Sequence, residues 1–239
     1  MCLLIAARKK ILDKDALESG YDNNSHGAGF AYSKDNQLFV EKGFFSFDDF
    51  LTAYNNIPDN SPNIVHFRLA TGGLMNDVNC HPFSISKNLA FAHNGIFSFI
   101  DACAEFSDTY HFNEEFMKPL FAKNNAGVYS TGAKFMIEKL IGYNKLAFLN
   151  NKGDVTIMNQ EAGDVHNGAW YSNNSYMYAR NFSKRKSAPS CSISARAAIQ
   201  PALPFRAVPM PAFIDWLSEQ YQEYQRESAE ETAAMVGAS

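Results

Sequence analysis

Cys2 follows the initiator Met1 directly and is the first residue whose position suggests chemistry. If Met1 is removed, Cys2 carries both a thiol and a free α-amine. Their reference pKa values are about 8.5 and about 7.7 to 8.0, so near neutral pH the amine can accept the thiol proton while the sulfur attacks a substrate. In the structural alternative, Cys2 is a small apolar residue that opens a buried strand over 2–7.

Two further motifs lie where predicted strands end. The segment 66–71 (HFRLAT) begins inside a predicted strand over 63–67, and the segment 92–95 (AHNG) continues a predicted strand over 89–92. A rigid scaffold commonly holds catalytic groups at such positions. Considered alone, Asn94-Gly95 in the second motif is also an ordinary turn dipeptide.

Taken in order, five segments resemble the motifs of class II glutamine amidotransferases, which are N-terminal nucleophile hydrolases: Cys2, 68–71, 79–83 (NCHPF), 92–96 and 107–109 (SDT). The resemblance covers residues 2–180. It implies that Cys2 attacks the side-chain amide of glutamine, releasing ammonia and leaving a γ-glutamyl thioester that water hydrolyses. It also implies that the Asn94 side chain and the Gly95 backbone amide donate to the oxyanion, and one such donor is worth roughly 3 to 4 kcal/mol.

The resemblance also implies a clamp for the two charged ends of glutamine. Arg68 matches the arginine that binds the α-carboxylate, for which a guanidinium fork is suited, and Thr71 matches a nearby hydroxyl donor. Asp108 matches the aspartate that receives the α-ammonium group. The structural alternatives are a surface position for Arg68, with its stem packed on apolar neighbours, and a helix N-terminus for Asp108, where a carboxylate is favoured by about 0.3 to 1 kcal/mol.

The composition excludes several classes of protein. A formal net charge of −4 and a pI near 5.9 argue against a nucleic-acid-binding protein. No run of apolar residues is long enough for a membrane span, and no signal peptide is recognisable, so we expect a cytoplasmic protein. We expect no metal and no cofactor, because the histidines lack metal-ligand spacing and the cysteines are widely separated, at positions 2, 80, 103 and 191.

The hydrophobic pattern predicts an α+β fold in which strands, then helices, then strands follow one another. Helices are predicted from Ser46 to about 55, from Ser107 to about 121 and over 130–142. The predicted strands cover 2–7, 27–33, 37–42, 63–67, 89–92, 145–150, 155–158, 170–172 and 176–179. The order is compatible with two sheets between helical layers. The resemblance specifies this as a four-layer αββα sandwich of two mainly antiparallel sheets.

Three regions are predicted along the chain: a glutamine amidotransferase domain over 2–180, a basic linker rich in Ser, Ala and Pro over 181–210, and an amphipathic helix with an acidic tail over 211–239. Nothing after position 180 resembles a synthase domain, so we expect a standalone glutaminase-type domain whose last helix binds an acceptor enzyme or a second copy of the chain. Two alternatives stay open. One is an N-terminal nucleophile hydrolase of another γ-glutamyl or amide substrate, and the other is a catalytically retired binding module.

Overall fold

The computed structural model describes residues 2–11, 13–100 and 103–177. These residues form a mixed α/β fold with one six-stranded and one four-stranded sheet. Each pair of neighbouring strands in both sheets is antiparallel. The linker predicted over 181–210 and the helix predicted over 211–239 lie outside the described residues.

The six-stranded sheet has the order β3-β2-β4-β1-β10-β9. Its strands are β1 Leu3–Ala7, β2 Ala28–Lys34, β3 Gln37–Phe44, β4 Asn63–Phe67, β9 Asp164–His166 and β10 Ala169–Tyr171. The four-stranded sheet has the order β5-β6-β7-β8, with β5 Phe83–Ser86, β6 Leu89–Asn94, β7 Lys145–Asn150 and β8 Val155–Met158. All five residues of β1 are buried, which fits its uninterrupted apolar sequence between two partner strands.

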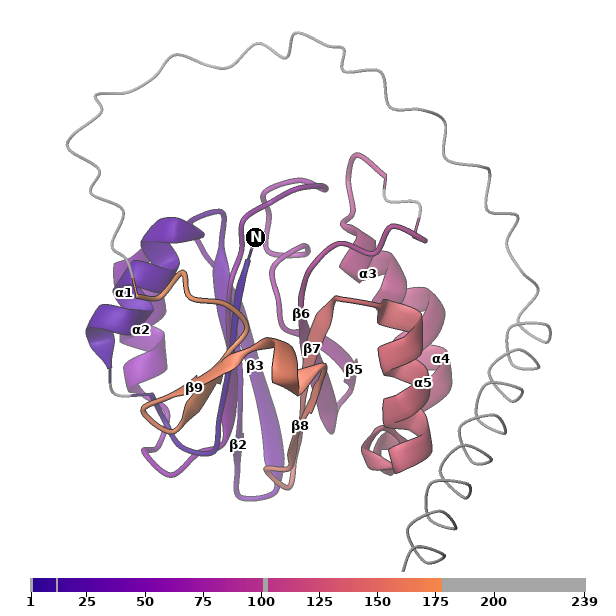
Figure 1. Ribbon diagram of the computed structural model, residues 1–239. Helices are drawn as coiled ribbons and strands as arrows, with labels where there is room; N and C mark the ends of the chain where they lie inside the picture. Colours follow the sequence, from indigo (N-terminus) through magenta and orange to yellow (C-terminus); the bar gives the residue numbers. More distant parts are fainter. Residues whose placement is uncertain (1, 12, 101–102, 178–239) are drawn as a thin grey trace, which may run out of the picture. The chain divides into compact units, whose positions relative to one another are not determined.

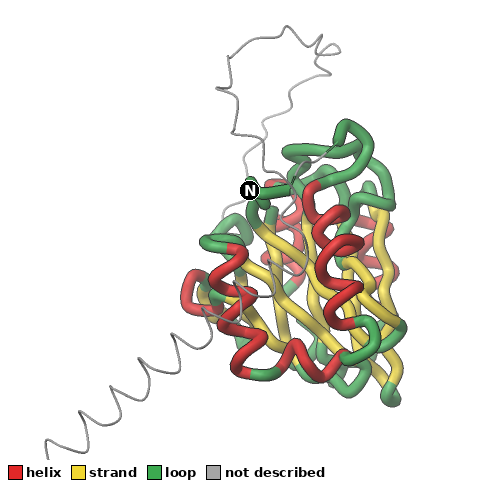
Figure 2. The backbone as a smooth tube through the Cα atoms, turned by 90° about the vertical axis from the view of Figure 1, so that its right-hand side faces the viewer, coloured by secondary structure: helices red, strands yellow, loops and turns green. Residues whose placement is uncertain are grey.

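Helices flank both sheets. Figure 1 shows α1 (Lys14–Asn23) and α2 (Phe47–Asn55) beside the six-stranded sheet, and α3 (Asp108–Phe112), α4 (Lys118–Phe121) and α5 (Thr131–Ile141) beside the four-stranded sheet. Seen from the side of α5, helices cross in front of the strands (Figure 2). A π-helical turn, Asn113–Met117, joins α3 to α4, and short 3-10 turns lie at Asn125–Tyr129 and Gln160–Ala162.

Serine residues cap three of the helices. The hydroxyls of Ser46, Ser107 and Ser130 each accept a hydrogen bond from the backbone N–H three residues later, at the starts of α2, α3 and α5. Such a cap satisfies a donor that the helix itself leaves unpaired. Because Ser107 caps α3, it also fixes the position of the next residue, Asp108.

Three apolar clusters account for the packing. The first joins α1 and α2 to one face of the six-stranded sheet, and the second joins α3, α4 and α5 to one face of the four-stranded sheet. The third contains residues of both sheets, among them Leu4, Ile64 and Trp170 from the first and Ala92 and Leu149 from the second. The two sheets therefore pack against each other through the faces that the helices leave free.

The prediction of a strand over 176–179 is wrong for the part that the structure describes. Tyr176 and Met177 lie in a turn, where the Tyr176 ring stacks on Tyr171 with ring centroids 3.9 Å apart. The helix α1 and the short strands β5 and β9 were not predicted. Among the described residues, no helix has the length and apolar character needed to cross a membrane.

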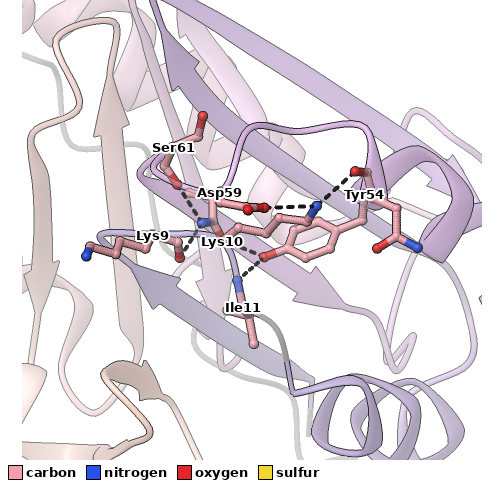
Figure 3. A network of polar contacts seen from close by, with 8 residues as sticks. Lys9, Lys10, Ile11, Tyr54, Asp59 and Ser61 are labelled. Carbon is pink, nitrogen blue, oxygen red and sulfur yellow. Dashed lines mark hydrogen bonds and ion pairs between the residues drawn. The ribbon is translucent and has the colours of Figure 1, made fainter.

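A polar network holds the end of β1 that lies away from Cys2 (Figure 3). The Tyr54 hydroxyl accepts from the Ile11 N–H at 2.9 Å and donates to Asn63 Oδ1 at 3.1 Å. Lys10 donates its backbone N–H to Asp59 O at 2.9 Å, and its Nζ lies 3.6 Å from Asp59 Oδ1. These contacts tie β1 to the segment between α2 and β4, so the strand that follows Cys2 is fixed at its far end.

Candidate active site

The alternation of side chains along the strands directs a group of polar residues into the space between the two sheets. Leu4 of β1 and Ala92 of β6 both belong to the apolar cluster between the sheets. Since side chains two residues apart on a strand share a face, Cys2 and Asn94 point into the same space. The Ser172 hydroxyl oxygen joins the two strand ends, because it lies 2.9 Å from Leu4 N and 2.7 Å from Asn94 Nδ2.

A pocket opens where this polar end of the space between the sheets meets the surface. Its lining comes from the residue before β1, the segment between β4 and β5, the end of β6 and the start of α3. The lining residues are Cys2, Arg68, Leu69, Ala70, Thr71, Gly72, His81, His93, Gly95, Ser107, Asp108 and Thr109. The pocket therefore brings together five of the six site residues predicted from the sequence. The sixth, Asn94, is buried and is not among the residues that line it.

The Cys2 thiol is held against the strand end that carries Arg68. The register of β1 and β4 pairs Leu3 with Phe67, which sets Cys2 beside the residues that follow β4. Leu69 N–H donates to Cys2 Sγ at 3.3 Å, and the thiol lies 3.5 Å from the Leu69 carbonyl oxygen. Asn173 Nδ2 donates to the Cys2 carbonyl oxygen at 2.7 Å. Cys2 is thus fixed on both its side chain and its backbone.

Burial raises the pKa of the Cys2 thiol above its ordinary value, and the hydrogen bond from Leu69 and the charge of Arg68 oppose this to a smaller extent. The thiol is therefore protonated at neutral pH. Among residues 2–11, 13–100 and 103–177, its hydrogen bonds go to the Leu69 backbone rather than to a histidine. A separate base is needed before the sulfur can attack.

Arg68 is buried, with only 3% of its surface exposed, so the alternative of a surface arginine is wrong. Its Nη1 donates to Leu74 O at 3.0 Å and its Nη2 to Gly72 O at 2.7 Å. The loop after β4 wraps around the guanidinium in this way. These two bonds use two of the five N–H donors of an arginine. Burial lowers the pKa of Arg68, but an arginine pKa starts so high that the group stays charged at neutral pH.

Asp108 lies both at a helix N-terminus and in the pocket. It is the first residue of α3, directly after the cap Ser107, and it also lines the pocket. Its Oδ2 accepts from Phe97 N–H at 2.7 Å and its Oδ1 accepts from Thr109 N–H at 2.7 Å. The Thr109 hydroxyl also lies 3.2 Å from Oδ1, so Oδ1 has two partners and Oδ2 can accept a further hydrogen bond. Thr71 lies at the exposed lip of the same pocket.

Gly95 has a backbone conformation and a contact that exclude a side chain. Its φ of 149° lies in a region that favours glycine. An added Cβ would lie 1.8 Å from Asn144 Oδ1. Asn94-Gly95 is also not a simple turn, because Asn94 is the last residue of β6 and pairs with Lys145. The backbone of Gly95 can thus approach the pocket closely.

Three buried histidines lie at the pocket: His81 and His93 line it, and His66 lies behind them in contact with His81. Burial lowers the pKa of His66 to about 3 and that of His93 to about 4, and it holds the pKa of His81 well below its usual range. All three are neutral at neutral pH. His93 Nε2 lies 2.9 Å from Asn144 Oδ1 and its Nδ1 lies 2.7 Å from Thr109 Oγ1. They support the site as fixed neutral groups, and in the described part of the chain no three His, Cys, Asp or Glu side chains are placed to hold a metal ion.

Two residues that connect the Cys2 strand to Asn94 were not predicted from the sequence. Ser172 and Asn173 follow β10 directly and contact Asn94, Leu4 and Cys2. The available signal was a run of polar residues, 172–175 (SNNS), after the apolar strand 169–171. Their partners lie 78 to 171 residues away along the chain, so the run alone did not indicate what it binds.

Comparison with known proteins gave little. No family model matches the chain. A search of curated proteins found no match. Among solved structures, the chain is similar to the glutamine phosphoribosylpyrophosphate amidotransferase from B. subtilis complexed with ADP and GMP, with 15% sequence identity and a TM-score of 0.42. The match covers 71% of this chain and 40% of that one, so the chain spans well under half of that protein. A likeness this distant carries no argument about activity, which must come from the site.

Proposed function

We propose that residues 2–177 form an N-terminal nucleophile hydrolase domain of the class II glutamine amidotransferase type, in which Cys2 hydrolyses the side-chain amide of glutamine. The observation that carries this proposal is one pocket that contains a fixed thiol, a buried guanidinium and a fixed carboxylate, from Cys2, Arg68 and Asp108. The three apolar clusters support a four-layer αββα arrangement for the domain.

The proposal requires that Met1 be removed. Since burial raises the pKa of the Cys2 thiol, the sulfur needs a base within reach. The α-amine that methionine removal frees is on the same residue and has a reference pKa of about 7.7 to 8.0, so it can take the thiol proton. A free thiol also requires reducing conditions, which is consistent with a cytoplasmic location.

The reaction then proceeds in two steps. In the first, the sulfur of Cys2 forms a bond to the amide carbon of glutamine, the C–N bond breaks, and the proton taken from the thiol passes from the α-amine to the departing ammonia. In the second, water attacks the thioester carbon, the C–S bond breaks, and the products are glutamate and the restored thiol. The Gly95 backbone N–H and the Asn94 amide stabilise the oxyanion that forms in each step.

Recognition of glutamine rests on its two charged ends. The N–H groups of Arg68 that are not used by the loop carbonyls bind the α-carboxylate, with the Thr71 hydroxyl as a further donor at the lip. The Asp108 carboxylate binds the α-ammonium group through Oδ2, which keeps a lone pair beyond the one used by Phe97 N–H. The fixed positions of both charged groups favour an amino-acid substrate over a simple amide.

One observation favours a second candidate, another γ-glutamyl or amide substrate. Arg68 already donates to Leu74 O and Gly72 O, so fewer of its donors are available for a carboxylate. Replacement of Arg68 by Ala distinguishes the candidates. The rate of hydrolysis of a substrate that lacks an α-carboxylate is insensitive to this change. Glutamine, in contrast, binds the variant more weakly, so its KM rises.

The test of the proposed function is glutamate formation from glutamine by the purified protein. We expect activity that is lost in Cys2→Ala and retained in Cys103→Ser, which removes an exposed cysteine outside the pocket. Chemical blocking of the α-amine should also abolish activity. A mature protein that retains Met1 and forms no glutamate would instead support the retired binding module.

A further inference from the structure

We propose that Ser172 is a positioning residue that turns the amide of Asn94 so that its NH2 group faces the reacting thiol. This inference rests on the proposed function, because it concerns the oxyanion donors of that reaction. The observations that carry it are the hydrogen bonds of two buried side chains, Ser172 with 1% and Asn94 with 3% of its surface exposed.

Backbone hydrogen bonds fix the Ser172 hydroxyl relative to Cys2. Ser172 N–H donates to Leu4 O at 2.9 Å, and Leu4 N–H donates to Ser172 Oγ at 2.9 Å. Leu4 lies two residues after Cys2 on the same strand. The next residue, Asn173, donates to the Cys2 carbonyl oxygen at 2.7 Å. Ser172 Oγ is therefore a fixed point beside β1, with one lone pair used by Leu4.

The amide of Asn94 has one partner and one unpaired atom. Its Nδ2 lies 2.7 Å from Ser172 Oγ, and its Oδ1 is buried with no hydrogen-bond partner among the described residues. In this orientation a buried acceptor is unsatisfied, and the Ser172 hydroxyl accepts twice without using its own proton. A buried unpaired acceptor of this kind costs free energy, so an amide orientation that pairs this oxygen is favoured.

Rotation of the Asn94 amide by half a turn provides that arrangement. The nitrogen and oxygen of an amide occupy nearly the same space, so the contact with Ser172 is kept. Ser172 O–H then donates to Asn94 Oδ1, while Ser172 Oγ still accepts from Leu4 N–H. The two N–H donors of Asn94 take the place of the unpaired oxygen. They remain free for the negative charge that forms when Cys2 attacks.

The strands place this free edge in the same space as the Cys2 side chain. Asn94 shares a face of β6 with Ala92, and Cys2 shares a face of β1 with Leu4, and both faces belong to the space between the sheets. Gly95, whose backbone N–H is the other proposed donor, lines the pocket together with Cys2. Ser172 thus acts on the oxyanion through Asn94 and does not touch the substrate.

The main test is a double-mutant cycle with Ser172→Ala and Asn94→Ala. One oxyanion donor is worth on the order of 10²-fold to 10³-fold in kcat, so we expect Ser172→Ala to lower kcat by about 10²-fold with KM changed by less than about twofold. In an Asn94→Ala background, Ser172→Ala should cause little further loss. Multiplied losses in the double variant would overturn the inference, because Ser172 would then act independently of Asn94.

Three controls separate positioning from a merely structural role. Ser172→Thr keeps a hydroxyl and should recover most of the activity. Alkylation of Cys2 by iodoacetamide, which forms no oxyanion, should keep its rate in Ser172→Ala; a large decrease would mean that Ser172 only holds β1 in place. Ser33→Ala removes another buried serine hydroxyl, which donates to Asn151 O at a distance of 2.7 Å. Neither residue lines the pocket, so this variant should leave kcat unchanged.

A measurement without substrate distinguishes failure of this inference from failure of the proposed function. In isotope-labelled protein, the side-chain amide protons of Asn94 can be assigned by their absence from Asn94→Ala. The rotated amide predicts weak cross-relaxation between these protons and the β-protons of Ser172. Strong cross-relaxation would overturn the inference. A protein that shows the weak pattern but does not hydrolyse glutamine would refute the proposed function alone.

Discussion

Replacement of Asp108 by Asn tests the recognition of the substrate's amino group. The change keeps the size of the side chain and removes its charge. A hydrogen bond to a charged group contributes about 1.5 to 3 kcal/mol, which corresponds to about a 10-fold to 150-fold increase in KM for glutamine. Because the amino group lies away from the reacting amide, kcat should change much less than KM. The assay is steady-state glutamate formation over a wide range of glutamine concentrations.

The structure also predicts a stability effect for this variant, which must be measured separately. The two oxygens of Asp108 accept from the N–H groups of Phe97 and Thr109, and the carboxamide of Asn keeps only one acceptor oxygen. Leaving one backbone N–H unpaired costs about 1 to 3 kcal/mol, and the lost charge at the start of α3 costs about 0.3 to 1 kcal/mol more. Urea unfolding measures this loss, and Asp48→Asn, in the first turn of α2, is a control for the helix-terminus contribution.

A substrate analogue separates recognition from a general defect. 4-Carbamoylbutanoate keeps the amide and the carboxylate of glutamine and lacks the amino group. We expect wild type and Asp108→Asn to hydrolyse it with similar kcat/KM, since Asp108 has no partner on this substrate. An equal loss on glutamine and on the analogue would refute the reasoning, because Asp108 would then support the fold of the pocket rather than bind the ammonium group.

Three further predictions concern the pocket and its scaffold. Gly95→Ala should lower stability by about 1 to 3 kcal/mol and abolish glutamate formation, because the new Cβ meets Asn144 Oδ1 at 1.8 Å; normal activity in this variant would contradict the role of the Gly95 backbone. Burial lowers the pKa of His66 to about 3, so as pH falls below about 6.5 the unfolded chain binds a proton at this residue before the folded protein does. The free energy of unfolding should therefore fall by about 1.4 kcal/mol per pH unit between about pH 6.5 and about pH 3 because of this group. Urea midpoints across this range should therefore depend less on pH in His66→Gln, and an unchanged slope would show that His66 does not carry the effect. Tyr54→Phe removes the acceptor for Ile11 N–H and should cost about 1 to 3 kcal/mol in thermal or urea unfolding without changing kcat, because Tyr54 acts at the far end of β1.

Local patterns in the sequence predicted most of the elements that position the site. The strands predicted over 2–7, 27–33, 37–42, 145–150 and 155–158 are confirmed as β1, β2, β3, β7 and β8. The helices predicted from Ser46, from Ser107 and over 130–142 are found as well, each beginning after a serine cap. These features depend on a few neighbouring residues, so a single sequence contains the information needed to recognise them.

Other features depend on contacts that the local sequence does not reveal. The helix α1 has few apolar residues, and it is stabilised by packing of Leu17 and Tyr21 on the six-stranded sheet. The π-helical turn after α3 interrupts the helical period expected over 107–121. The strand predicted at Tyr176 failed because aromatic residues are common in strands, whereas this ring packs on Tyr171 from a turn.

The candidate site shows the same division. The motifs around Arg68, Asn94 and Asp108 were recognisable as short segments, and the fold brings Arg68 and Asp108 to one pocket with Cys2. The role of Ser172 was not recognisable, because its partner Leu4 is 168 residues away along the chain. That contact depends on the register in which β1 pairs with β10, and this register cannot be read from a single sequence.

The central claim is that Cys2, freed of Met1, is the nucleophile of a glutamine-binding pocket. The most direct test is the intact mass of the purified protein before and after treatment with an electrophilic glutamine analogue, followed by mapping of the labelled residue. We expect a chain that lacks Met1 and gains one label, on Cys2, with protection by excess glutamine. Retention of Met1, or a label on Cys80 or Cys103 that glutamine does not prevent, would contradict the claim.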